Sequence, residues 1–259
     1  MPTSLPPLSR EKLKNLRSAA SARIRRRKRM CFVEGERALE EARASGFLDY
    51  LVFSGEGGAA GRMDPDTAGF PGIPGFTLEG GSFSRLSDVR AGTGVIGAAR
   101  IPPGGKFPTL VERKGPSTLV FLDGLQDPGN VGGIIRSGWA FGIQGVLLGR
   151  GTADPFSPKG VRASAGGVFH LPLYHGITEA DLEELAESGY TISLAQAGGA
   201  DLGTVPFGPH SILALGSEGH GFSKAVRAMG QPVSVPMVPG VDSLNVVVAG
   251  SIILAEMVK

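Results

Sequence analysis

The second half of this chain alternates short apolar runs with segments of helical character. The apolar runs, which contain few polar residues, are 118–122, 145–148, 168–171, 190–195, 211–215 and 233–235. Strands that are buried on both faces of a parallel sheet have this composition. The segments with helical patterns are 130–141, 158–165, 179–188, 222–229 and 243–257. This alternation predicts an α/β domain built on a mostly parallel sheet.

The first hundred residues predict a smaller α/β unit. Short apolar stretches at 31–33, 50–53 and 94–99 stand between segments of helical pattern, at 12–29, 34–44 and 84–89. Residues 55–75 hold many glycines and prolines and predict a loop. Residues 101–117 contain four prolines and three glycines, which is typical of a linker. We therefore expect an N-terminal domain at 1–105, a linker at 106–116 and a C-terminal domain at 117–259.

Composition narrows the class of protein. The chain has 259 residues and one cysteine, Cys31, which excludes an internal disulfide and a zinc-finger-type site. No apolar run approaches the roughly 18 residues of a membrane-spanning helix, and residues 1–14 lack the apolar stretch of a secretory signal. The histidines are scattered, so no metal is expected. We expect a cytoplasmic protein with no membrane contact.

Charge is concentrated near the N-terminus. Residues 10–29 hold ten Lys and Arg and one acidic residue, Glu11, while the rest of the chain carries a net charge of −7. Such a block favours a polyanionic partner, and nucleic acid in particular, although it is also compatible with a solvated tail that binds nothing. The residues expected to contact RNA phosphates are Arg23, Arg25, Arg26, Arg27, Lys28 and Arg29.

A glycine pattern in the first domain invites a different interpretation, that of a dinucleotide site. Residues 92–97 match Gly-x-Gly-x-x-Gly. That fingerprint needs a strand before it and a helix after it. The preceding residues 82–90 are polar, and Pro102-Pro103 soon follows, so we reject a nicotinamide or flavin oxidoreductase.

Three segments of the second half carry polar residues directly after an apolar run. In the first, Asn130 is a plausible helix cap and Arg136 follows six residues later. Three glycines, Gly132, Gly133 and Gly138, weaken that helix, which suggests close packing or an approaching ligand. An ordinary strand-to-helix junction would look similar.

The second segment, Gly216-Ser217-Glu218-Gly219, sets one carboxylate in a loop of glycines after an apolar strand. The third passes from Pro236-Met237 to Ser243-Leu244-Asn245 and then into an apolar helix, for which Asp242 or Ser243 is the expected cap. Loops at the carboxyl ends of parallel strands are where α/β folds bind ligands. Capped turns with only a structural role remain the alternative for both segments.

Together, in this order and spacing, the three segments resemble the motifs of the SpoU (TrmH-type) RNA ribose 2′-O-methyltransferases, part of the knotted SPOUT class. The resemblance covers residues 117–259, and residues 162–166 with 169–173 are similar to a segment that links the family's motifs. The N-terminal part, from Phe32-Val33-Glu34-Gly35 onward, is similar to the ribosomal-protein-like RNA-recognition domain of longer members.

The resemblance implies a parallel sheet with a deep trefoil knot, a homodimer formed through the C-terminal domain, and S-adenosylmethionine as cofactor. It assigns to cofactor binding Leu194, Ala195, Leu215, Gly216, Gly219, Val235, Met237, Ser243 and Leu244. It assigns to catalysis Asn130, Arg136, Glu218, Ser243 and Asn245. Because a guanidinium stays protonated in proteins, we expect Arg136 to hold the target phosphate rather than to act as a base.

The expected activity is methylation of a ribose 2′-hydroxyl in structured RNA, with large-subunit (23S-type) rRNA favoured over tRNA by the extra N-terminal domain. A catalytically idle RNA-binding protein of the same fold is the rival from another class. Such a protein would have lost motif residues, whereas all five polar positions are present here.

Overall fold

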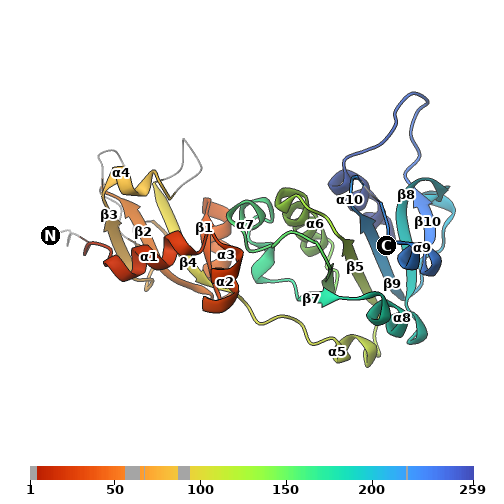
Figure 1. Cartoon of the computed structure of the whole chain (residues 1–259), viewed down its shortest axis with the longest axis horizontal. Coiled ribbons are helices and arrows are strands. Elements are labelled where there is room, and N and C mark those ends of the chain that lie inside the picture. Colours follow the sequence, from red (N-terminus) through yellow and green to blue (C-terminus); the bar gives the residue numbers. More distant parts are fainter. Residues whose placement is uncertain (1–4, 56–64, 67, 87–93, 220) are drawn as a thin grey trace. The chain divides into compact units, whose positions relative to one another are not determined.

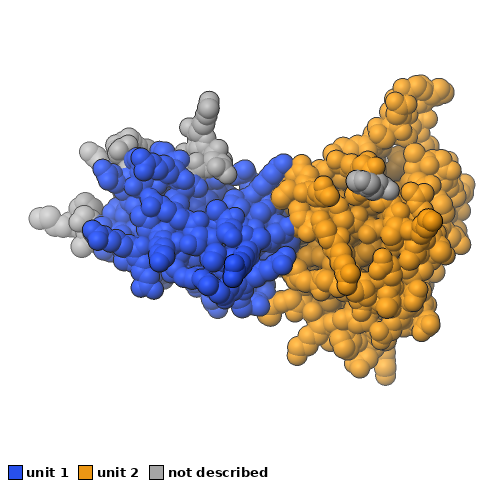
Figure 2. Space-filling view, in the orientation of Figure 1, with its two compact units in different colours: residues 1–102, 154–169 blue, residues 103–153, 170–259 orange. Residues whose placement is uncertain are grey.

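The computed structural model describes the chain except residues 1–4, 56–64, 67, 87–93 and 220. It divides into two compact units, coloured separately in Figure 2. Unit 1 comprises residues 1–102 and 154–169, and unit 2 comprises residues 103–153 and 170–259.

Unit 2 is built on a six-stranded sheet in the order β10-β8-β9-β5-β6-β7 (Figure 1). The strands are β5 (Ser117–Asp123), β6 (Gly145–Gly149), β7 (Leu173–Ile177), β8 (Thr191–Asp201), β9 (His210–Gly216) and β10 (Gln231–Ser234). Every neighbouring pair is parallel, which confirms the expected α/β class and its parallel sheet. Along β9 five consecutive residues, 211–215, are buried, as the apolar runs predicted.

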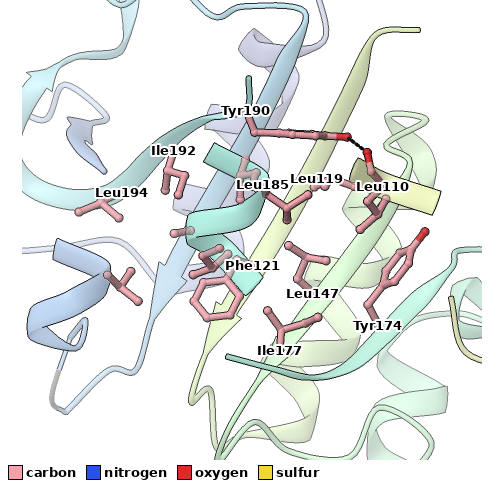
Figure 3. Close-up of a cluster of buried hydrophobic side chains, with 14 of the residues drawn as sticks. Leu110, Leu119, Phe121, Leu147, Tyr174, Ile177, Leu185, Tyr190, Ile192 and Leu194 are labelled. Atoms are coloured by element: carbon pink, nitrogen blue, oxygen red, sulfur yellow. Dashed lines mark hydrogen bonds between the residues drawn. The ribbon is translucent and has the colours of Figure 1, made fainter. Parts of the chain in front are cut away.

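The main core of unit 2 is formed by this sheet and three of its helices. The helices of the unit are α5 (Pro108–Val111), α6 (Pro128–Ala140), α8 (Glu179–Glu187), α9 (Lys224–Met229) and α10 (Val246–Met257). Figure 3 shows strand residues such as Phe121, Leu147 and Ile192 pointing toward Leu185 of α8. Leu110 of α5 joins this core, and its carbonyl oxygen accepts a hydrogen bond from the Tyr190 hydroxyl at 3.4 Å. The segment expected as a linker therefore contributes a buried side chain to unit 2.

Helices α6 and α10 pack closely because glycines remove side chains from their contact. A Cβ on Gly133 would lie 2.9 Å from Cγ1 of Val247, and a Cβ on Gly250 would lie 2.9 Å from Cδ1 of Ile134. The Ser137 and Ser251 hydroxyls join the two helices by a hydrogen bond of 2.7 Å. Of the two explanations for the glycines of this segment, close packing is the one that Gly133 shows.

Unit 1 holds a four-stranded sheet in the order β1-β4-β2-β3. Its strands are β1 (Met30–Glu34), β2 (Leu48–Ser54), β3 (Gly75–Leu78) and β4 (Val95–Arg100), and its first helices are α1 (Arg10–Ser18), α2 (Ala22–Lys28), α3 (Glu36–Ala44) and α4 (Gly80–Phe83). Strand β4 is antiparallel to β1 and β2, whereas β3 is parallel to β2. Phe32, Tyr50 and Ile96 form part of the core between this sheet and Leu16 of α1.

Residues 154–169 belong to unit 1 although they lie between β6 and β7 in the sequence. They form α7 (Pro158–Ala163) and the short 3-10 helix η2 (Gly167–Phe169). Asp154 pairs with Arg25 of α2 at 2.7 Å, and Arg162 pairs with Glu34 of β1 at 3.1 Å. The chain therefore completes its first unit with a segment drawn from the middle of its second half.

Several elements differ from the sequence prediction. The expected helix at 12–29 is two helices, α1 and α2, separated by residues 19–21. Where a strand was expected at 168–171, the chain forms η2 instead. The strand of this region is β7, which begins six residues after the start of η2. Residues 56–64 and 67 of the expected loop at 55–75, and residues 87–89 of the expected helix at 84–89, lie outside the described residues.

Both helix caps of the polar segments were assigned wrongly. Asp127 caps α6, since its Oδ1 accepts from the amide of Gly129 at 2.7 Å, and Pro128 takes the first helical position. Asn245, rather than Asp242 or Ser243, caps α10, since its Oδ1 accepts from the amide of Val247 at 2.9 Å. Caps one to three residues apart look alike in sequence because Asp, Asn and Ser all accept such bonds.

Two further findings concern a dinucleotide site and a membrane-spanning helix. After Gly94 the chain enters β4 rather than a helix, as the rejection of a dinucleotide site required. Among the described residues, no helix is long and apolar enough to cross a membrane.

Candidate active site

Two of the three polar segments of unit 2, those with Glu218 and with Ser243 and Asn245, line one cavity at the carboxyl ends of parallel strands. The cavity has a volume of about 540 Å³. It is lined by residues of β8, by the carboxyl ends of β9 and β10, by the loop after β10 and by the first turns of α10. These residues are Ala195, Gln196, Ala197, Leu215, Gly216, Glu218, Val233, Ser234, Val235, Met237, Ser243, Leu244, Asn245, Val246, Ala249 and Ile253. We call it the main cavity.

Three polar side chains, one from each segment, form a chain of hydrogen bonds beside the main cavity. The Asn130 amide Nδ2 donates to Glu218 Oε1 at 2.5 Å, and Asn130 Oδ1 accepts from Asn245 Nδ2 at 3.4 Å. Asn245 is fixed in turn because its own oxygen caps α10. The two bonds hold the Asn130 amide from both sides, so its orientation is determined by its neighbours.

A second, smaller cavity has a volume of about 170 Å³. Its lining consists of Leu125, Gln126, Asp127, Asn130, Ser217, Glu218 and Gly219. Glu218 lines both cavities, so the two spaces meet at this residue. An arrangement of this kind can hold a cofactor in one space and present a second reactant from the other.

Most of the residues predicted for cofactor binding line the main cavity. Those that do are Ala195, Leu215, Gly216, Val235, Met237, Ser243 and Leu244. Leu194 does not, because its side chain is buried in the core and lies against Gly230. Gly219 lines the smaller cavity instead.

The predicted catalytic residues divide into two groups. Asn130, Glu218, Ser243 and Asn245 come together at the two cavities. Arg136 is exposed on α6 and lines neither of them. Gln126 and Gln196 also line the cavities and were not predicted from the sequence. The available signals were the place of Gln126 in the loop after β5 and of Gln196 within β8.

Residues 10–29, the basic segment, contain some cations that bond to other residues of the protein and others that are exposed. Arg25 is 3% exposed, and its guanidinium donates to Asp154 Oδ2 and to the carbonyl oxygens of Ala19 and Ala20. These bonds give Arg25 a structural role and argue against the predicted contact with RNA, because all of them would have to break. Lys28 bonds to Asn15, and Arg29 donates to the carbonyl oxygens of Ile101 and Pro102.

The remaining basic side chains of this segment face solvent. Arg23, Arg26 and Arg27 are exposed on α2. Arg10, Lys14 and Arg17 are exposed on α1 and line a shallow hollow of about 360 Å³. Lys12 differs, because its ammonium lies 4.5 Å from the centre of the Tyr50 ring. Six exposed cations on two short helices make a surface suited to a polyanion.

Among the described residues, the cysteine and the other side chains able to bind a metal do not form a second reactive site. Burial raises the pKa of the Cys31 thiol well above its ordinary value, so this cysteine is a core residue and not a nucleophile. His170 stacks on Trp139 with ring centroids 4.5 Å apart. In the described part of the chain, no three His, Cys, Asp or Glu side chains are grouped so that they could hold a metal ion.

Proteins similar in sequence to this chain include RNA methyltransferases. The chain is 28% identical to the 23S rRNA (guanosine(2553)-2′-O)-methyltransferase RlmP of Bacillus subtilis over 250 residues, which cover 95% of this chain and 96% of that protein. It is 34% identical over 151 residues, 57% of this chain and 61% of the relative, to a Staphylococcus haemolyticus protein assigned to the TrmH family of tRNA/rRNA methyltransferases.

Solved structures show the same fold over nearly the whole chain. The AdoMet-bound rRNA methyltransferase of Sinorhizobium meliloti superimposes on this chain with a TM-score of 0.78 and a sequence identity of 25%. The superposition covers 98% of this chain and 96% of that protein. The profile of the family described as SpoU rRNA Methylase matches residues 117–255, which include all three polar segments. The chain therefore belongs to the SpoU rRNA Methylase family.

Proposed function

We propose that this protein transfers a methyl group from S-adenosylmethionine to a ribose 2′-hydroxyl in large-subunit rRNA. The observation that carries the proposal is the convergence of Asn130, Glu218 and Asn245 between two adjoining cavities. The likeness to RlmP supports rRNA as the substrate, since it extends over both halves of the chain.

The main cavity fits the cofactor in size and chemistry. Its volume of about 540 Å³ lies within the range of roughly 300–1,000 Å³ usual for small-molecule sites. Most of its lining residues are apolar or glycine, and its polar residues are Gln196, Glu218, Ser234, Ser243 and Asn245. S-adenosylmethionine, when bound, supplies a methyl group on a positively charged sulfur. Leu215, Gly216, Val235 and Leu244 would hold it mainly through backbone atoms.

Asn130, Glu218 and Asn245 then have a positioning task. Their hydrogen bonds fix the wall between the two cavities, so that a ribose in the smaller cavity would face the cofactor in a constant geometry. Positioning of reactants alone can remove about 7–11 kcal/mol from a barrier. Arg136 would hold a target phosphate through its planar fork.

RNA would be held by the exposed cations of unit 1. We assign this contact to Arg23, Arg26 and Arg27 on α2 and to Arg10, Lys14 and Arg17 on α1. Contacts of this kind fix the backbone of the RNA and carry no sequence information. The choice of nucleotide would therefore depend on unit 2 and on the shape of the RNA.

A homodimer formed through unit 2 completes the proposal, together with the deep knot of the SPOUT class. Helix α10 leaves Val248 46% exposed and Ile252 40% exposed, and the loop before it extends away from the sheet (Figure 1) with Val238 and Val241 exposed. A second copy could cover these side chains. Light scattering on the purified protein tests this, and a monomer at micromolar concentration would contradict it.

Two assays decide between the candidate substrates. Ribose methylation is mapped in total RNA from cells with and without the gene, and the purified protein is then tested on unmodified transcripts of large-subunit rRNA and of tRNA. Loss of one rRNA methylation, with methyl transfer only to the rRNA transcript, is the expected result. A missing tRNA methylation would favour the tRNA activity, to which the Staphylococcus relative points. Cofactor binding without any methyl transfer would favour the idle RNA-binding protein.

A further inference from the structure

Two backbone hydrogen bonds between Ser217 and Gly221 close the loop that carries Glu218, in which residue 220 lies outside the described residues. This loop runs from Gly216 at the end of β9 to Ser223 at the start of α9, and we call it the Glu218 loop. Within it the amide of Ser217 donates to the carbonyl oxygen of Gly221 at 3.2 Å, and the amide of Gly221 donates to that of Ser217 at 2.8 Å. The position of the Glu218 carboxylate therefore depends on how the ends of this loop are held.

Asp123, the last residue of β5, meets both ends of the Glu218 loop. Its backbone stands opposite Gly216 in the pairing of β5 with β9. Its carboxylate Oδ2 accepts a hydrogen bond from the amide of Ser223 at 3.1 Å. Ser223 is the N-cap of α9, where its own hydroxyl accepts from Val226, so the carboxylate also ties the start of that helix to the sheet.

We propose that Asp123 is a positioning residue for methyl transfer, which acts by holding the Glu218 loop so that Glu218 faces Asn130. The proposal rests on the proposed function of this site. Asp123 lines neither cavity, so its effect passes through the loop and not through contact with a reactant. Arg227 gives the loop a second attachment, since its Nε donates to the carbonyl oxygen of Phe222 at 3.1 Å. We therefore expect Asp123 variants to keep the fold.

The experiment compares Asp123→Ala with Asp123→Asn, which keeps an oxygen that can accept the Ser223 amide. Thr178→Ala is the matched control, because it removes a single helix-capping side chain at α8, away from both cavities. Single-turnover methyl transfer is measured on an unmodified transcript of large-subunit rRNA with saturating enzyme and cofactor. We expect Asp123→Ala to lose roughly 10²-fold in rate, as small misplacements of reacting groups do. Asp123→Asn should recover most of that rate, and Thr178→Ala should equal the wild type.

A double-variant cycle tests the route of the effect. If Asp123 acts through Glu218, Asp123→Ala should slow a Glu218→Gln enzyme far less than it slows the wild type. Hydrogen exchange adds a measurement that needs no RNA: the peptide spanning 216–223 should exchange faster in Asp123→Ala and unchanged in Thr178→Ala.

Three results would overturn the proposal: an Asp123→Ala rate equal to that of the wild type, losses that multiply in the double variant, or unchanged exchange in peptide 216–223. A wild-type enzyme that is inactive on the rRNA transcript would count against the proposed function instead. The exchange measurement would still decide whether Asp123 holds the loop.

Discussion

Asn130 shows how much a single amide depends on its neighbours. Its nitrogen faces Glu218 and its oxygen faces Asn245, so each side of the amide meets the partner of the correct polarity. Glu218 lies 88 residues away in sequence and Asn245 lies 115 residues away. At the scale of the residue, the site is a set of polar groups held by one another, and Arg136 is the predicted member that stands outside it.

Arg136 gives the residue-scale prediction. If its guanidinium holds a phosphate through two parallel bonds, Arg136→Lys keeps the charge and loses the second bond. We expect Lys to lose nearly as much single-turnover rate as Ala does, while calorimetry shows S-adenosylmethionine binding retained in both, since Arg136 does not line the main cavity.

Near wild-type rates for Arg136→Lys would show that a point charge suffices. An active Arg136→Ala enzyme would remove Arg136 from the catalytic residues altogether.

At the scale of elements, close approach of α6 and α10 connects packing to the site. Both helices begin beside the cavities, with Asn130 in the first turn of α6 and Asn245 capping α10. The contact between them is made at Gly133 and Gly250. A side chain added at this contact would move the elements that carry two of the polar residues.

Gly133→Ala tests that connection. The added Cβ would lie 2.9 Å from Cγ1 and 3.0 Å from Cγ2 of Val247, a β-branched residue with little rotamer freedom. We expect the free energy of unfolding to fall by about 1–3 kcal/mol, in spite of the better helix propensity of Ala, and cofactor affinity to fall with it.

Urea unfolding measures the first effect and calorimetry the second. Gly208→Ala is the control, because nothing lies within 4 Å of a Cβ at that position. The double variant Gly133→Ala, Val247→Ala should lose less free energy of unfolding than the sum of the losses of the two single variants. Losses that simply add would show that the two side chains do not clash.

The two parts of the basic segment should respond differently to substitution. Replacing Arg23, Arg26 and Arg27 by Ala should weaken RNA binding and reduce its salt slope by roughly 0.7–0.9 for each lost phosphate contact, with stability unchanged. Arg25→Ala should leave that slope unchanged and lower stability by about 3–5 kcal/mol, because it leaves the Asp154 carboxylate, which is 14% exposed, without its guanidinium partner.

Binding of a large-subunit rRNA fragment across a range of salt concentrations, together with urea unfolding, separates the two outcomes. A reduced salt slope in Arg25→Ala at unchanged stability would reverse the assignment.

At the scale of the whole molecule, the chain crosses between its units three times, after residues 102, 153 and 169. All residues that line the two cavities belong to unit 2. The core of this unit also contains Leu110 from the expected linker. Unit 1 keeps the exposed cations and takes residues 154–169 from the second half. Cofactor binding and RNA binding should therefore be separable in part.

A fragment of residues 103–259 should bind S-adenosylmethionine, as calorimetry can show, with an affinity close to that of the full chain. A fragment that begins at 117 should be less stable, because it lacks Leu110, whose carbonyl oxygen accepts from the Tyr190 hydroxyl. Loss of a buried leucine costs about 2–5 kcal/mol. Absence of binding in the longer fragment, with binding intact in the full chain, would show that unit 1 is needed to form the main cavity.

The sequence by itself determined five of the six strands of the parallel sheet, all but β7, and the three polar segments of the site. Burial on both faces leaves a continuous apolar run, and a functional loop after such a run keeps its polar residues side by side, so both signals are local. Five strands of unit 2 and the meeting of Asn130, Glu218 and Asn245 follow from these signals once the chain folds, whereas β7 lies after the apolar run that was expected to form it.

Only the tertiary structure decided which polar and basic residues are structural. Arg25 and Arg26 are neighbours with the same side chain, yet one is buried against Asp154, 129 residues away, and the other faces solvent. The docking of residues 154–169 on unit 1 and the anchoring of the Glu218 loop by Asp123 are decided in the same way. Such contacts depend on which elements become neighbours in space, and the local pattern of a sequence does not contain that information.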